Sequence, residues 1–378
     1  MGDRKPTRAK PAGSGRARGG VKLRGSSRGS AAERSAAAEL PAAGEFGFIE
    51  WLLTRCPTNR FMTIGSGDDC AALKIPAGQE LLFAIDSVVD GVHFRRRVDG
   101  LQAAGRKAVL RNLSDIAAMG GRPLAAVAGL GLPAGKGGLS AAEKAALFAG
   151  LAEGCRRHGT ALAGGDISRT RGALWISVAI LGMAPTGTAL RRDTARAGDA
   201  IYVTGRLGGS GRPGQAGQTG QAGRTGQAGR HLDFPPRLAE GEFLRRGKLA
   251  SACMDISDGL ARDLANLCRA SRVGADIEAA AVPIARVLEQ DRRLRPAARL
   301  TQALGDGEDF ELLFTVRPRE EARLVRAWRR ATVAGAKLAP ITRVGRIVAA
   351  AQGGRGVRLL DETGRARPLT VRGWEHEV

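Results

Sequence analysis

The sequence has few aromatic residues and lacks several patterns that identify common classes of protein. It contains one Tyr, ten Phe, four Trp and four His in 378 residues. No two of its five cysteines form a CxxC pair, which argues against zinc-ribbon and thioredoxin-like motifs. Their odd number and the apolar surroundings of several predict small buried thiols in a reducing compartment.

Long apolar runs are also missing. No stretch reaches the roughly 18 residues that a helix needs to cross a bilayer. The first residues lack the apolar core of a secretory signal. We therefore expect a cytoplasmic protein with no membrane partner. A hydrophobic content of 43% supports a globular fold, and a length of 378 residues favours two domains.

The common phosphate-binding loops are absent too. Gly247-Lys248 has the wrong spacing for a P-loop, and Leu249 replaces its magnesium-binding hydroxyl. Residues 209–214 formally match GxGxxG, but a proline and the glycine repeat after it argue against a helix starting there. If the protein binds phosphate, it needs another device: metal ions on carboxylates, supported by loop amides and an arginine.

Positive charge is abundant and unevenly distributed. The net charge is +22, and ten basic against three acidic residues give residues 1–40 a share of +7. Residues 1–43 have too few large apolar side chains to offset the entropy of ordering, so we expect a disordered basic tail. The tail fits either a nucleic-acid-binding arm or a solubilising or misassigned start. The second is favoured because no stacking aromatics are interleaved with the charges, so nucleic acid is a disfavoured partner.

A second low-complexity segment lies inside the chain. Residues 211–229 place glycine at every third position, as collagen does, but the segment is short and has one proline. We expect residues 211–230 to form a flexible glycine-rich loop.

From residue 44 onward, hydrophobic periodicity predicts alternating helices and strands. We expect helices at 45–54, 101–119, 141–158, 260–271 and 319–334, and strands at 71–75, 81–85, 125–132, 161–163, 174–181, 201–204, 310–316 and 341–349. Ser140 and Glu143 have capping-box spacing, and Asp258 or a neighbour is the expected cap of the helix at 260. The pattern predicts a mixed sheet covered by helices at residues 44–183 and an α+β domain at 184–378.

Six acidic clusters next to glycine, serine or apolar runs are the most informative feature. They are Gly67-Asp68-Asp69, Asp86-Ser87, Ser114-Asp115, Gly164-Gly165-Asp166, Asp255-Ile256-Ser257-Asp258 and Gly307-Glu308-Asp309. Alone, each cluster fits an Asx turn or a helix cap better than a site. A carboxylate at the end of an apolar strand is costly to bury unless it is paired or holds a cation. Oxygen ligands suit Mg²⁺, so six clusters together favour a metal–phosphate site.

In this order, the segments resemble the thiamine-monophosphate kinase family of the aminoimidazole-ribotide-synthetase-like superfamily, over roughly residues 44–378. The matching segments include residues 64–71, Asp86 with Gly91-Val92-His93-Phe94, residues 112–120, Gly164-Gly165-Asp166, residues 198–205, residues 255–260, residues 307–312 and the closing Gly373-Trp374. No single motif is decisive, but the ordered set is strong.

The resemblance implies a fold and an activity. The expected fold is an α/β N-terminal domain whose sheets pair across a homodimer, followed by an α+β C-terminal domain. The expected reaction is ATP- and Mg²⁺-dependent phosphorylation of thiamine monophosphate to the diphosphate. The attacking phosphate oxygen is already an anion, so we assign no general base.

The resemblance also implies site residues. The metal ligands would be Asp69, Asp86, Asp115, Asp166, Asp255 and Asp258; the ATP contacts Gly165, Asp166, Arg192 and Ser257; and the substrate contacts His93, Glu308 and Trp374. A carboxylate and an indole suit the thiazolium and aminopyrimidine rings of thiamine. One departure is that Ala84 and Ile85 stand where the family tends to carry hydroxyl residues, which leaves the number of metal ions open.

Two rival functions remain at this point. One is another ATP-dependent synthetase of the same superfamily. A selenophosphate synthetase would need a reactive cysteine closely followed by lysine, and neither Cys56 nor Cys70 has that setting. The other is an RNA-binding protein that uses the basic tail, which would bind RNA with a steep dependence on salt.

Overall fold

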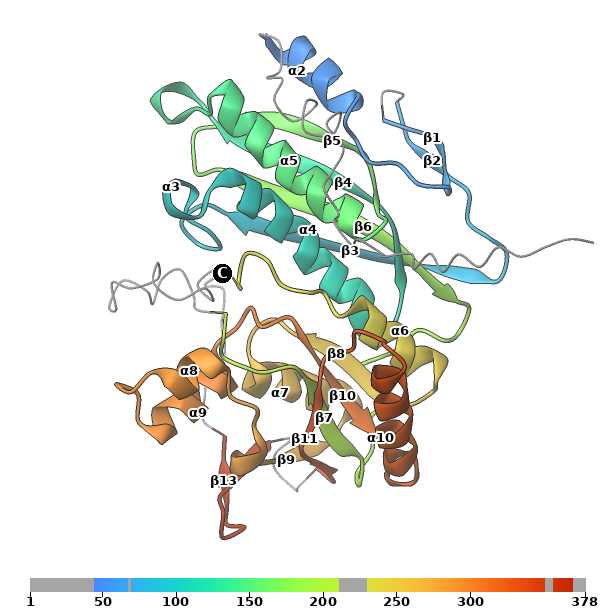
Figure 1. The fold of residues 1–378 in the computed structure, drawn as a ribbon, viewed down its shortest axis with the longest axis vertical. Coiled ribbons are helices and arrows are strands. Elements are labelled where there is room, and N and C mark those ends of the chain that lie inside the picture. The colour runs from blue at the N-terminus through green and yellow to red at the C-terminus, as the bar shows by residue number, and fades with distance from the viewer. Residues whose placement is uncertain (1–43, 67–68, 211–229, 351–355, 370–378) are drawn as a thin grey trace, which may run out of the picture. The chain divides into compact units, whose positions relative to one another are not determined.

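The computed structural model describes residues 44–66, 69–210, 230–350 and 356–369, which all fall in one compact unit. The predicted tail 1–43, residues 211–229 of the predicted loop, and Trp374 lie outside the described residues. The described chain forms two halves, each a β-sheet packed against helices (Figure 1). None of its helices is long and apolar enough to span a membrane.

The first half is built on a four-stranded sheet. Its order is β3 (Gln79–Val89), β6 (Trp175–Pro185), β4 (Arg122–Pro133) and β5 (Ala161–Thr170). Only β4 and β5 are parallel. The smaller elements are α2 (Gly44–Leu53), α3 (Arg96–Asp99), a 3-10 turn (Gly135–Gly137), and the paired strands β1 (Met62–Ile64) and β2 (Ala72–Leu73).

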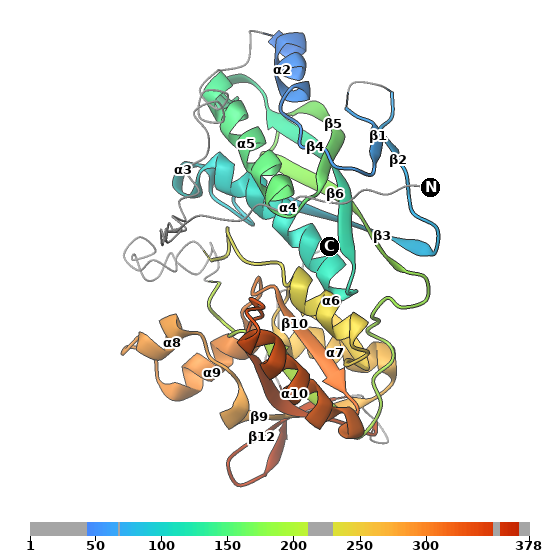
Figure 2. The same cartoon turned by 45° about the vertical axis from the view of Figure 1, so that its right-hand side comes forward.

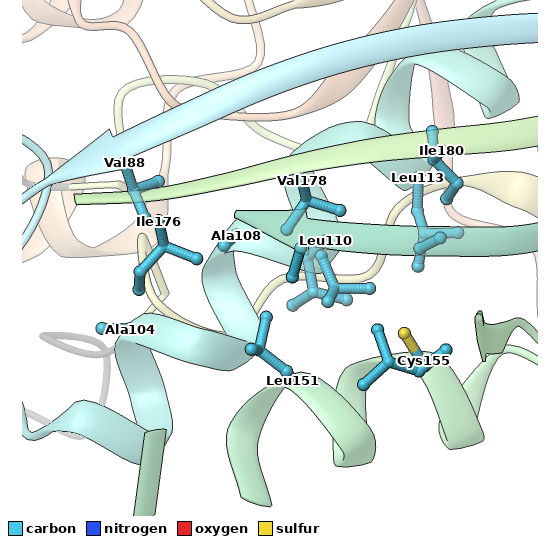
Figure 3. Close-up of a cluster of buried hydrophobic side chains, with 14 of the residues drawn as sticks. Val88, Ala104, Ala108, Leu110, Leu113, Leu151, Cys155, Ile176, Val178 and Ile180 are labelled. Carbon is cyan, nitrogen blue, oxygen red and sulfur yellow. The ribbon is translucent and has the colours of Figure 1, made fainter. Parts of the chain in front are cut away.

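Two adjacent helices, α4 (Leu101–Ala118) and α5 (Ala141–Arg157), cover one face of this sheet. In Figure 3, Leu110 of α4 lies below Val178 of β6 and Leu113 below Ile180, and Leu151 of α5 packs in the same cluster. The helices pack closely because glycines line their contact: a Cβ at Gly105 would lie 2.3 Å from a backbone oxygen of α5. The burial of these aliphatic side chains holds the first half together.

The opposite face of the sheet is partly covered by the β1–β2 segment, which packs on Ala125, Ala163 and Met183, but it is open along β3 in the described chain. Residues along β3 alternate, so Leu82 and Val88 point into the core while Leu81, Phe83 and Ile85 point outward. Phe83 is 73% exposed. An exposed row of large apolar side chains on a sheet is typical of a surface that binds another protein chain.

The second half contains a seven-stranded sheet. Its order is β13 (Ala366–Pro368), β12 (Val357–Leu360), β9 (Gly274–Glu278), β11 (Ile341–Val348), β7 (Ala200–Thr204), β10 (Glu311–Val316) and β8 (Ala252–Ile256). Its helices are α6 (Leu238–Arg246), α7 (Leu260–Ser271), α8 (Arg286–Gln290), α9 (Pro296–Gly305) and α10 (Pro318–Val333), with a 3-10 turn at Ala279–Ala281.

Helices cover both faces of this second sheet. On one face, Ile201 and Val203 of β7 pack with α7. On the other, Tyr202 packs with Trp328 of α10 and Leu244 of α6, and Figure 2 shows α10 lying across β10. The C-terminal end of α4 joins this second cluster through Ala117 and Ala118. Helix α4 therefore packs in the cores of both halves.

The predicted fold class is confirmed, and most predicted elements lie within a few residues of their expected positions. The Ser140–Glu143 capping box is present in both directions. The cap position of α7 is Gly259, the residue after Asp258, and no side chain caps the helix there. Asp86 lies inside β3 and not at its end, since pairing with β6 continues to Val89.

Candidate functional site

Three carboxylates meet where the two halves join. Asp86 comes from β3, Asp115 from α4 and Asp255 from β8. Burial and the charges of Asp255 and Asp86 raise the pKa of Asp115 to about 8. Burial also raises the pKa of Asp255, although it accepts a 2.8 Å hydrogen bond from the Ser114 hydroxyl. We call Asp86, Asp115 and Asp255 the acidic centre.

Local structure explains why these side chains converge. The alternation of β3 places Asp86 on the face that α4 covers. Asp115 is in the last turn of α4, and Asp255 is in the edge strand that α4 contacts. The positive charges of Arg111 and Arg192 lower the pKa of Asp115, but burial and the two neighbouring carboxylates outweigh them.

The donor chemistry of the acidic centre fits a hard cation. Its ligand atoms are carboxylate oxygens, the type that Mg²⁺ prefers, and their mutual repulsion is relieved when a cation binds. No group of three or more His, Cys, Asp or Glu side chains in the described ranges is already arranged as a metal site. Mg²⁺ usually keeps several waters and substrate phosphates among its ligands, so it does not require such a preformed cage.

A cavity of about 700 Å³ lies in the first half, and three of the predicted residues line it: Asp69, Gly165 and Asp166. Gly165 is required by the backbone, because a Cβ there would lie 2.0 Å from Ala128 O on β4. Asp166 is exposed and accepts a 2.9 Å hydrogen bond from Ser168. The backbone of β5 thus forms part of the cavity wall, and the Asp166 carboxylate lies beside it.

A buried ion pair forms the third part of the site. The Lys107 side chain is fully buried, and its Nζ lies 2.8 Å from Glu308 Oε1 and donates a 2.6 Å hydrogen bond to the His93 carbonyl oxygen. Burial opposes ionisation of Glu308, but the charges of Lys107 and Arg111 prevail and lower its pKa. Lys107 therefore holds two predicted substrate residues, one from each half.

The loop that carries Glu308 is strained. Glu308 and Phe310 have φ angles of 66° and 47°, a region that residues other than glycine seldom adopt. Hydrogen bonds hold this loop to its neighbours. Glu308 N donates to Ser257 O at 2.7 Å, and the Asp309 carboxylate accepts hydrogen bonds from the backbone of Gly208 and Gly209. Strain that is held in this way is common at functional sites.

The predicted site residues therefore fall into three groups. Asp86, Asp115 and Asp255 form the acidic centre, with Arg192 close enough to affect the pKa of Asp115 and Asp255. Asp69, Gly165 and Asp166 line the cavity, and His93 and Glu308 meet at Lys107. Asp258 and Ser257 follow β8, next to the Glu308 loop.

Sequence reasoning missed Lys107, Arg111 and His231. Lys107, Arg111 and Asp115 are spaced four residues apart, which places them on one face of α4, and this spacing was the available signal. His231 is 4% exposed, and neither ring nitrogen has a hydrogen-bond partner among the described residues. Burial and Lys107 lower its pKa.

Comparisons with known proteins show which family the chain is similar to. Residues 67–184 match the family described as AIR synthase related protein, N-terminal domain, and residues 196–356 match the corresponding C-terminal domain. The thiamine-monophosphate kinase of Rhodopirellula baltica is 36% identical over 311 residues, which cover 80% of this chain and 89% of that protein.

Solved structures of similar proteins match most of the chain. The thiamine-monophosphate kinase of Stenotrophomonas maltophilia K279a has a TM-score of 0.71 at 33% identity, covering 86% of this chain and 98% of that chain. AaThiL complexed with AMPPCP and TMP has a TM-score of 0.66 at 28% identity, covering 88% and 97%. These similarities do not favour the other synthetases or the RNA-binding alternative.

Proposed function

The chain belongs to the thiamine-monophosphate kinase family, and we propose that it transfers the γ-phosphate of ATP to thiamine monophosphate to give thiamine diphosphate. The acidic centre is the observation that carries this proposal. It brings carboxylates from both halves next to the Lys107–Glu308 pair, and the pKa of Asp115 is about 8 because burial and the charges of Asp255 and Asp86 outweigh the charges of Arg111 and Arg192. Such a site suits a metal-bound polyphosphate beside a second substrate.

The proposed reaction requires no protein base. A phosphate oxygen of thiamine monophosphate forms a bond to the γ-phosphorus, and the bond from that phosphorus to the β-bridging oxygen breaks. ADP leaves with the electron pair, and no proton has to move because the attacking oxygen is an anion. Bound Mg²⁺ would supply positive charge between the two anionic substrates. The protein's part is to hold them in line.

We assign the metal to the carboxylates that sequence reasoning chose: Asp69, Asp86, Asp115, Asp166, Asp255 and Asp258. ATP would contact Gly165, Asp166, Arg192 and Ser257. His93, Glu308 and Trp374 would bind thiamine monophosphate. The exposed positions of Asp69 and Asp166 in the cavity support roles in which they reach toward a ligand.

We also propose a cytoplasmic homodimer that pairs through the open face of the first sheet, and a functional division into residues 44–183 and 184–378. The exposed apolar row on β3 supports the dimer, since burial of Phe83 and its neighbours would remove a large apolar surface from water. The proposed use of ATP as the phosphate donor supports a location in the cytoplasm.

Measuring ADP release tests the activity. We expect ADP only when ATP, Mg²⁺ and thiamine monophosphate are all present, and no ADP when EDTA replaces the metal. Turnover with free thiamine but not with its monophosphate would contradict the proposal. Parallel assays with aminoimidazole precursors test whether the protein instead has the activity of another ATP-dependent synthetase of the same superfamily.

A further inference from the structure

Helix α4 presents a row of three charged side chains that connects two parts of the site. Asp115 belongs to the acidic centre, and Lys107 binds Glu308 and the His93 carbonyl. At 1.5 Å per residue, the eight positions between Lys107 and Asp115 span about 12 Å along the helix. Arg111 lies midway in this row, about 6 Å from each end.

The contacts of Arg111 extend toward both neighbours. Its Nε donates to Asp86 Oδ2 at 3.3 Å, and its Nη1 lies 3.8 Å from Glu308 Oε1, too far for a hydrogen bond. The guanidinium carbon lies 5.8 Å from the centre of the Phe310 ring, within the range of a cation–π contact. Arg111 thus stands between a proposed metal ligand and a proposed substrate residue.

One corner of this guanidinium makes no hydrogen bond, and it faces Glu308 only across the 3.8 Å ion-pair distance. The side chain is 13% exposed, and Nη1 is buried with no hydrogen-bond partner among the described residues. An unpaired buried donor costs about 1–3 kcal/mol, more when it is charged, so native proteins keep few of them. The Arg111 guanidinium has one donor bonded to Asp86 and another, Nη1, without a hydrogen bond. Such a planar group can bind an anion that offers several acceptor oxygens.

We propose that Arg111 binds the phosphate group of the acceptor substrate, with Nη1 donating to a phosphate oxygen, and thereby selects thiamine monophosphate over free thiamine. This inference rests on the proposed function. The acceptor phosphate must approach the γ-phosphate of ATP, and the fixed charge of Arg111 offsets their repulsion.

A purely structural Arg111 would only link Asp86 to Glu308. Its loss would then weaken the binding of thiamine and thiamine monophosphate by the same factor, because both would meet the same disturbed pocket. A phosphate-binding Arg111 affects only the ligand that carries phosphate. The difference between the two ligands therefore separates the roles.

The experiment compares Arg111→Met and Arg111→Lys with the unaltered full-length protein. Calorimetry measures the affinities for thiamine monophosphate and thiamine, with Mg²⁺ and a non-hydrolysable ATP analogue present. We expect Arg111→Met to lose about 10- to 100-fold in affinity for thiamine monophosphate, the scale of one charge-assisted hydrogen bond. Affinity for thiamine should change less than twofold, and Arg111→Lys should recover part of the loss.

Arg106→Met is the matched control. Arg106 lies on the same helix, is 15% exposed and pairs with Glu153 and Asp233, away from the acidic centre. Its removal should leave both affinities unchanged. Equal losses for both ligands in Arg111→Met, or no loss for either, would overturn the role of Arg111. Absence of ADP release by the unaltered protein would instead contradict the proposed function.

Discussion

The Ser114 hydroxyl donates a 2.8 Å hydrogen bond to Asp255 Oδ2, and this buried contact joins α4 of the first half to β8 of the second. This hydrogen bond lowers the pKa of Asp255 against the effect of burial. Ser114 therefore sets the position of one proposed metal ligand relative to another.

We expect Ser114→Ala to lower the free energy of unfolding by about 1–3 kcal/mol, since it leaves a buried carboxylate without its donor. The Mg²⁺ concentration for half-maximal activity should rise. Urea unfolding and a magnesium titration measure the two effects. Ser168→Ala is the control, because Ser168 donates the same kind of bond to exposed Asp166 and its loss should barely change stability.

Removal of a carboxylate from the acidic centre should separate activity from stability. We expect Asp115→Asn to reduce kcat by at least about 100-fold, the scale for losing a main charge-stabilising element. Without Mg²⁺, its melting temperature should equal or exceed that of the unaltered protein, because repulsion from Asp255 and Asp86 is relieved.

Steady-state kinetics and thermal denaturation with EDTA check this pair of outcomes, and Asp86→Asn should lose activity likewise. The exposed Asp193→Asn, whose partner is Arg191, should change neither quantity. Near-normal turnover of Asp115→Asn with an unchanged Mg²⁺ requirement would mean that this carboxylate is structural.

Charge on the open sheet face should disrupt the proposed dimer. We expect Phe83→Lys to convert a dimer into a monomer, as measured by light scattering after size-exclusion chromatography. Val98→Lys is the control: Val98 is 68% exposed, similar to Phe83 at 73%, but it lies on α3 outside the sheet. A monomeric unaltered protein, or a Phe83→Lys variant of dimeric mass, would contradict the expected interface.

Stability should fall with rising pH in a window set by Asp309. Burial raises the pKa of Asp309 to about 7, although Gly208 donates to it. Between about pH 4 and 7 the folded carboxyl stays protonated while the unfolded one ionises, so the unfolded state is favoured progressively. The slope approaches about 1.4 kcal/mol per pH unit and vanishes above about pH 7.

Asp309→Asn should remove this contribution. Urea unfolding at several pH values gives the difference in unfolding free energy between the unaltered protein and the variant. That difference should decline from pH 4 to 7 and then stay constant. A difference that is flat across the window would show that Asp309 ionises normally in the folded protein.

Local signals made much of the fold predictable. The Ser140–Glu143 box fixes the start of α5, and the alternation along β3 places Phe83 and Asp86 on opposite faces. Such features depend on neighbours within a few residues, so the sequence displays them directly. The acidic centre was predictable as a set of residue types, but its geometry was not.

Long-range pairing explains what was missed. Lys107 and Glu308 are 201 positions apart, and nothing near either residue indicates the other. The strands expected at 71–75 and 81–85 are neighbours in sequence but do not pair with each other, because β2 pairs with β1 and β3 pairs with β6. Short strands such as β12 and the edge strand β13 carry too few residues for a periodic pattern.

The shared helix has a consequence for folding. Leu110 and Leu113 of α4 complete one hydrophobic core, while Ala117 and Ala118 fill another. A chain cut between the two family matches would strip the second half of part of its core and expose to water the side chains of α6 that pack on α4. The halves should therefore melt in one calorimetric transition, and the second half expressed alone should aggregate.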